Sequence, residues 1–233
     1  MAETEQETRV RWARRGVRAA VVGMVSWVIG VALIPLDAKV ENGERALTDT
    51  LSSMPGRLHL AAMLAVAGGV LLVAFFAALT RLVPEGEPGW GLLRVSLAGC
   101  VVTQTMVAVG ASFALAGFHT AAAGADPSIV AFAWRGLWLT FTASAVPTVL
   151  FTVTGVLGMA EAGLAAGWVG VLGWISAGAH VIAMFTLAQS GPFAPDGMVG
   201  SLTPITTVVW ILAAAVGLRK RVQSRPRELG TTG

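Results

Sequence analysis

The chain has 233 residues, of which 55% are hydrophobic and 12% are charged. Soluble domains contain about 25% charged residues, so this composition excludes a disordered protein and a nucleic-acid-binding domain. Cys100 is the one cysteine, which excludes a disulfide scaffold and a cysteine-based metal cluster. The net charge of +3 comes from basic residues that flank apolar runs, where they act as topology signals beside anionic headgroups. We therefore expect an all-α polytopic membrane protein with the lipid bilayer as its partner and no nucleic acid.

Six apolar segments are long enough to cross the bilayer, which takes about 20 helical residues. In chain order they cover about 17–35, 58–83, 92–118, 128–159, 164–188 and 202–218. The sequence thus predicts one six-helix transmembrane domain over 17–218, between basic tails at 1–16 and 219–233. Arginine and alanine are frequent and lysine occurs twice, which is typical of a high-GC bacterial genome. The predicted location is the bacterial plasma membrane.

The segments between the predicted spans also indicate local structure. The segment 37–55 is charged and tolerates helix, so it predicts a short amphipathic or irregular lid. The segment 84–89 predicts a tight turn, because its prolines and glycines do not continue a helix. Asp126 followed by Pro127 predicts an N-cap that begins the fourth span.

Lysine and arginine set the orientation, because cytoplasmic loops carry an excess of them. One side of the predicted topology holds twelve: Arg9, Arg11, Arg14, Arg15, Arg18, Arg81, Arg94, Arg219, Lys220, Arg221, Arg225 and Arg227. The other side holds three: Lys39, Arg45 and Arg57. Both termini are therefore predicted to be cytoplasmic, which an even number of spans also requires.

Helix association in lipid depends on close approach at small residues. The predicted fifth span offers glycines at helical spacing, and Gly155 and Gly158 do so in the fourth. Four tryptophans are interpreted as interface anchors: Trp27, Trp90, Trp168 and Trp210. Trp134, Trp138 and Trp174 fit an inward position equally well.

Polar residues inside apolar spans are costly and mark the candidate site. Five gather toward the predicted outer half: Arg57, His59, His119, Arg135 and His180. They predict an outer-facing polar pocket floored by His180, in which Arg135 suits an anionic headgroup and the histidines suit proton transfer or metal binding. Each also has a structural interpretation. Arg57, His59 and His119 are explained as solvated helix ends. Arg135 is explained by snorkelling of its side chain to the headgroups, and His180 by a hydrogen bond near Ser176. Gln104 is expected to join helices.

We expect binding of a lipophilic or amphipathic small molecule, without a cofactor or a metal motif. One alternative is a membrane enzyme on a polyprenyl or lipid substrate, similar to a terpene cyclase, with an acid and aromatic rings around a carbocation. Its candidate residues are Asp37, Asp126, Phe118, Phe132, Trp134 and Trp138. A small transporter is a second possibility, and a haem protein with two facing histidines is a third.

Four segments resemble a broad group of six-helix bacterial membrane proteins of unassigned function. They are 54–60 (MPGRLHL), 145–149 (AVPTV), 167–173 (GWVGVLG) and 191–197 (GPFAPDG). The likeness extends over about residues 15–218 and depends largely on small and apolar residues. It implies the fold and a membrane location, and it implies no functional residue.

Overall fold

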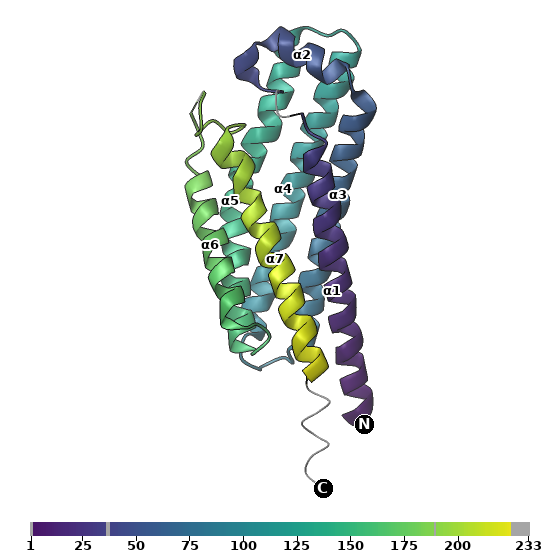
Figure 1. Ribbon diagram of the computed structural model, residues 1–233, viewed down its shortest axis with the longest axis vertical. Helices are drawn as coiled ribbons and strands as arrows, with labels where there is room; N and C mark the ends of the chain where they lie inside the picture. Colours follow the sequence, from purple (N-terminus) through teal and green to yellow (C-terminus); the bar gives the residue numbers. More distant parts are fainter. Residues whose placement is uncertain (1, 36–37, 189, 225–233) are drawn as a thin grey trace.

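The computed structural model describes residues 2–35, 38–188 and 190–224, and in this part of the chain the regular structure is helical throughout. The elements are α1 (Ala2–Ala32), the short 3-10 helix η1 (Val40–Asn42), α2 (Glu44–Ser52), α3 (Pro55–Leu82), α4 (Trp90–Ala122), α5 (Pro127–Glu161), α6 (Gly167–Ala183) and α7 (Met198–Ser224). Figure 1 shows the long helices side by side, with α2 across one end.

The six longer helices form a ring. Each one packs mainly on two neighbours, in the order α1, α3, α4, α5, α6, α7 and back to α1. The start of α1 and the end of α7 lie together at one end, which we call the terminal end (Figure 1). We call the opposite end the α2 end. The ring leaves a central space that side chains from all six helices face.

Five helices among the described residues are long and apolar enough to cross a membrane: α1 from Glu7 onward, α3, α4, α5 and α7 up to Arg221. They agree with five of the six predicted spans. The fold is thus that of a helical membrane protein. α4, α5 and α7 continue a few residues beyond the predicted apolar runs at both ends, and α1 begins 15 residues before its predicted span, because polar segments also adopt helical backbone.

The remaining predicted span, 164–188, is longer than its helix. α6 has 17 residues, about 25 Å at 1.5 Å per residue, against about 30 Å of hydrocarbon. The helix ends where Thr186 donates its hydroxyl proton to the carbonyl of Ala183 at 2.6 Å. The amide of Phe185 also bonds to the carbonyl of Ile182, a tightening typical of a last helical turn. The apolar composition of 164–188 therefore predicted a longer helix than the structure contains.

The predicted lid is confirmed as a helix. α2 buries Leu47 and Leu51 and contacts both α4 and α5. These leucines belong to an apolar cluster at the α2 end, the upper cluster, which consists of Ala38, Leu47, Leu51, Leu58, Ala114, Phe118, Ala121, Val130, Ala131, Trp134 and Leu137. Leu47 and Leu51 are four residues apart and so share the one face that the helix buries.

A second apolar cluster, the lower cluster, fills the ring toward the terminal end. It consists of Ala13, Ala20, Met24, Leu72, Phe75, Phe76, Leu79, Val83, Leu93, Cys100, Phe151, Val156, Met159, Val169, Val208, Trp210, Ile211, Ala213, Ala214, Ala215 and Leu218. Its centre is aromatic: Phe76 lies edge-on to Phe151 with ring centroids 5.5 Å apart, and Trp210 lies 6.0 Å from Phe151. Trp210 is completely buried, so its interpretation as an interface anchor is wrong. Trp168 is half exposed on the outside of α6, as an anchor should be.

Glycines bring neighbouring helices into contact at the predicted Gly158 and also between α1 and α3, where the spacing predicted nothing, whereas a Cβ atom on Gly167 of the predicted fifth span meets nothing within 4 Å. A Cβ atom on Gly68 of α3 would lie 2.6 Å from the carbonyl oxygen of Gly23 in α1. A Cβ atom on Gly158 of α5 would lie 3.0 Å from Leu93 of α4. No larger side chain fits at these crossings without moving a backbone.

Candidate functional site: a polar cavity in the middle of the bundle

A cavity of about 70 Å³ lies in the centre of the ring, and part of its boundary is open. Some of its walls belong to the lower cluster, and Phe141, which packs on the upper cluster, provides another. Its lining consists of Met24, Trp27, Gly69, Leu72, Thr103, Gln104, Val107, Phe141, Ser144, Thr148, Phe151, His180, Pro204, Thr207 and Val208. All six ring helices contribute, so the cavity exists only in the assembled bundle.

Among the described residues that line the cavity, His180 is the one ionisable side chain. It lies near the end of α6, with 7% of its surface exposed. Its Nδ1 atom is 2.9 Å from the backbone carbonyl of Ser176, one turn earlier. A carbonyl only accepts, so Nδ1 donates, and the neutral ring then has an acceptor lone pair at Nε2. The predicted partnership with Ser176 is confirmed, through the backbone rather than the hydroxyl.

Gln104 lies on α4, and its Oε1 atom is buried without a hydrogen-bond partner. The amide packs against α3 at Gly69, where a Cβ atom would overlap with it. Gln104 therefore touches a second helix, as expected, without the hydrogen bond that was expected to join them. A buried amide oxygen without a partner is uncommon in native proteins, and each case calls for a physical explanation such as a bound molecule.

Hydroxyl groups surround these two residues. Thr103 of α4 and Thr148 of α5 lie 3.4 Å apart, oxygen to oxygen. Ser176 of α6 and Thr207 of α7 lie 2.8 Å apart. The second contact is a short hydrogen bond that joins α6 to α7 near the cavity. Serine and threonine side chains commonly join helices in this way in membranes.

Sequence analysis did not predict Thr103, Ser144, Thr148 or Thr207 as cavity residues. It interpreted Trp27 as an interface anchor, but this tryptophan lines the central cavity. A signal exists in the spacing, because Ser144 and Thr148 are four residues apart and so share one helix face. It is weak, because a hydroxyl in an apolar helix satisfies itself on its own backbone. Ser144 does so with the carbonyl of Phe141.

The structure brings two of the other predicted site residues together. The rings of His59 on α3 and His119 on α4 have centroids 6.5 Å apart and an interplanar angle of 79°. Both histidines are exposed and lie in the turns nearest the α2 end. Arg57 is also exposed, and its Nη1 atom is 3.7 Å from the sulfur of Met54. None of the three lines the cavity.

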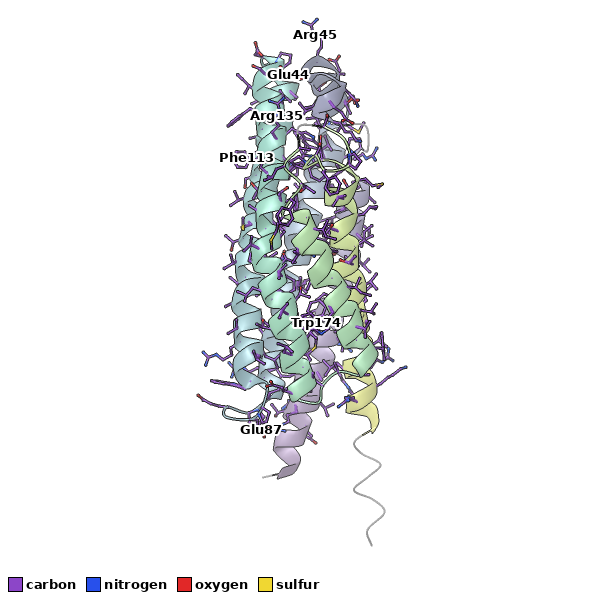
Figure 2. All side chains as sticks on the ribbon, turned by 90° about the vertical axis from the view of Figure 1, so that its left-hand side faces the viewer. Glu44, Arg45, Glu87, Phe113, Arg135 and Trp174 are labelled. Carbon is purple, nitrogen blue, oxygen red and sulfur yellow. The ribbon has the colours of Figure 1, made fainter. Side chains whose placement is uncertain are left out.

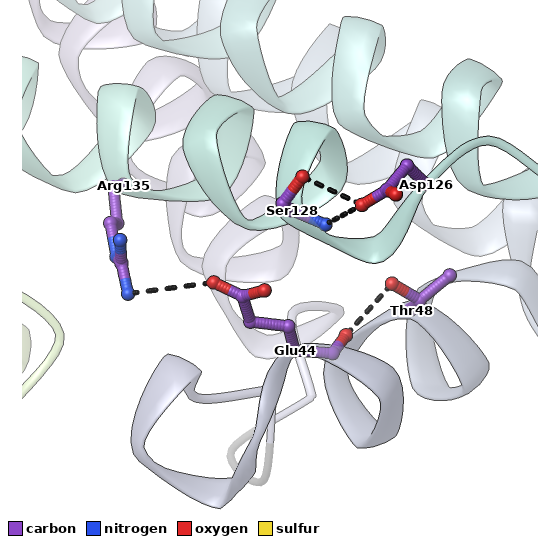
Figure 3. A network of polar contacts seen from close by, with 5 residues as sticks. All are labelled: Glu44, Thr48, Asp126, Ser128 and Arg135. Atoms are coloured by element: carbon purple, nitrogen blue, oxygen red, sulfur yellow. Dashed lines mark hydrogen bonds and ion pairs between the residues drawn. The ribbon is translucent and has the colours of Figure 1, made fainter.

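Arg135 takes part in a separate contact. Its Nη2 atom lies 3.9 Å from Oε1 of Glu44, the first residue of α2 (Figure 3). The two side chains are 58% and 43% exposed, and such pairs contribute about 0–1 kcal/mol. Figure 2 shows both residues at the α2 end, far from Trp174 on α6. Of the five predicted residues, His180 alone lines the cavity.

Residues proposed for the enzyme alternative are dispersed. Asp126 is exposed and caps α5, accepting bonds from the amide and the hydroxyl of Ser128 at 2.8 and 2.6 Å (Figure 3). These bonds lower its pKa, opposite to the shift that a general acid needs. Phe132 is 71% exposed, and Asp37 lies outside the described residues. Phe118, Trp134 and Trp138 pack around the upper cluster.

Among the described residues, no three His, Cys, Asp or Glu side chains are grouped as metal ligands. No family model, curated protein or solved structure matches this chain. Helix length, apolar composition and the helical architecture define a helical membrane protein.

Proposed function

We propose that this membrane protein binds an amphipathic or lipophilic small molecule inside its helix bundle, with the polar group of that molecule in the central cavity. The observation that carries the proposal is a central cavity lined by His180, whose Nε2 atom is left as an acceptor, and by the side chain of Gln104. A bound polar group would pair with that nitrogen and would account for a polar space between apolar walls. Cofactor-free binding of this kind needs only the side chains present.

The proposed site lies further inward than the position that the sequence predicted. Arg57, His59, His119 and Arg135 stay candidates for contacts with lipid headgroups at the outer surface, with the α2 end facing outward. The proposed topology has six spans, including the short α6, and cytoplasmic termini in a bacterial plasma membrane. The skewed distribution of arginine supports this orientation. Membership of the six-helix group of bacterial proteins remains part of the same proposal.

The test is to identify what co-purifies with the protein. The full chain is purified in a mild detergent and analysed by native mass spectrometry, together with the variants Gln104→Leu and His180→Phe. We expect a retained small molecule whose occupancy falls at least about tenfold in both variants, because a lost hydrogen bond to a buried group costs about 1–3 kcal/mol.

Thr105→Val is the matched control. Thr105 is the next residue on α4, but it is exposed on the outer face and bonds to its own helix at the carbonyl of Val101. It should retain the ligand. Equal occupancy in the wild-type protein and in both cavity variants would contradict the proposal. Turnover of farnesyl diphosphate by the purified protein would instead favour the enzyme alternative.

A further inference from the structure

We infer that the cavity accepts the uncharged hydroxyl end of a lipid-like alcohol, and that it discriminates against carboxylate, phosphate and ammonium ends. This inference rests on the proposed binding function and names its ligand class. It follows from three properties of the lining: its free hydrogen-bonding atoms, its charge and its size.

The lining contains N–H donors on Gln104 and Trp27 and one free acceptor on His180. The hydroxyls of Thr103, Ser144 and Thr148 donate to carbonyls of their own helices at 2.7–3.0 Å. Their protons are therefore not available to a ligand. The acceptor that remains is Nε2 of His180, because Nδ1 donates to a carbonyl and Oε1 of Gln104 is buried against Gly69. A hydroxyl donates to this nitrogen and can also accept a bond, whereas a ligand with acceptors alone leaves the nitrogen unpaired.

The part of the lining that the structure describes contains no aspartate, glutamate, lysine or arginine. A charged ligand group would lose its hydration there without gaining an opposite charge, which is strongly unfavourable in an apolar surrounding. Arg135, the residue that the sequence predicted for an anionic headgroup, is paired with Glu44 at the α2 end instead. The ligand group must therefore be both a proton donor and neutral, which a hydroxyl is.

The cavity size limits the polar group to a few atoms. A volume of about 70 Å³ holds about five to seven water molecules at 10–15 Å³ each. A hydroxyl and its first carbons fit this volume, whereas a sugar headgroup does not. The walls beside it are apolar and aromatic, among them Trp27, Leu72 and Phe151. They suit a hydrocarbon chain that leaves through the open part of the boundary.

The test compares probes that share one tail. Binding of farnesol, farnesyl methyl ether and farnesoate to the full chain in nanodiscs is measured by native mass spectrometry at pH 8. We expect farnesol to bind at least about tenfold more tightly than the ether, which lacks the proton, and than the carboxylate, which is charged. His180→Phe should weaken the binding of farnesol and abolish the difference in affinity between farnesol and the ether. Thr105→Val should change neither the affinity for farnesol nor that difference.

Two results would overturn the inference, and they are distinguishable from each other. If the ether or the carboxylate binds wild-type protein as tightly as farnesol, and binding still depends on Gln104, the binding function holds and the hydroxyl class is wrong. If binding of none of the probes responds to Gln104→Leu or His180→Phe, the proposed function is wrong as well. The comparison of probes on wild-type protein needs no variant and is independent of any effect of substitution on folding.

Discussion

The indole Nε1 of Trp134 donates to the backbone carbonyl of Ala38 at 2.9 Å, across 96 positions of the sequence. Trp134 belongs to α5 and is completely buried, and Ala38 begins the segment that leads into α2. This bond attaches the segment that precedes α2 to α5, and so it holds the lid on the helix bundle. The buried leucines of α2 then pack beside the same indole in the upper cluster.

Replacing this tryptophan tests how the lid is held. Trp134→Phe keeps an aromatic ring but leaves the Ala38 carbonyl without its donor, so we expect a loss of about 1–3 kcal/mol in the free energy of unfolding. Hydrogen exchange should rise across 38–52. Trp174→Phe is the control, because Trp174 is 51% exposed, and a change within about 0.5 kcal/mol is expected. Equal effects of both substitutions would argue against the anchoring role.

Close packing of α6 against its neighbours predicts the effect of a single methyl group. In Gly173→Ala the new Cβ would overlap with Val156 and lie 2.8 Å from Nε1 of Trp210. We expect a destabilisation of about 1–3 kcal/mol, measured as unfolding in mixed micelles. At Gly178, on the same helix, a Cβ meets nothing within 4 Å. Gly178→Ala should be neutral or slightly stabilising, and a comparable loss there would refute the packing argument.

The pair formed by Arg135 and Glu44 should be weakly coupled. Both side chains are substantially exposed and their charged atoms are 3.9 Å apart. A double-mutant cycle with alanine at each position should therefore give a coupling energy below about 1 kcal/mol in thermal unfolding. A coupling well above that value would show that the lid is held by this ion pair.

The cap of α5 predicts a dependence on pH. Bonds from Ser128 lower the pKa of Asp126 in the folded protein. Its stabilising effect is therefore present above the pKa of the unfolded chain and is lost as the pH falls through the folded pKa. Asp126→Ala should lower the melting temperature at pH 7, and the difference from wild type should shrink in acid. A difference that stays constant with pH would show that ionised Asp126 has no such role.

Membrane orientation is tested with cysteine labelling. Arg45 on α2 and Glu87 in the turn before α4 are exposed and lie at opposite ends of the molecule (Figure 2). With the proposed topology, an impermeant maleimide labels Arg45→Cys in intact cells and labels Glu87→Cys only after lysis. The native Cys100 is buried and gives the background. The reverse pattern would invert the proposed orientation.

The sequence predicted the features that depend on local composition. Apolar length identified five spans, because the thickness of hydrocarbon sets that length. The N-cap at Asp126 and the amphipathic lid were predictable because their signals lie within a few residues.

Only the tertiary structure decided which faces of the helices meet. In lipid, the outward face of a helix is as apolar as its inward face, so hydrophobic periodicity does not separate them. For this reason the burial of Trp210, the pairing of Arg135 with Glu44 and the shared cavity of Gln104 and His180 could not be derived from spacing. Each depends on contacts between helices that are distant in sequence, and packing at small residues selects those contacts.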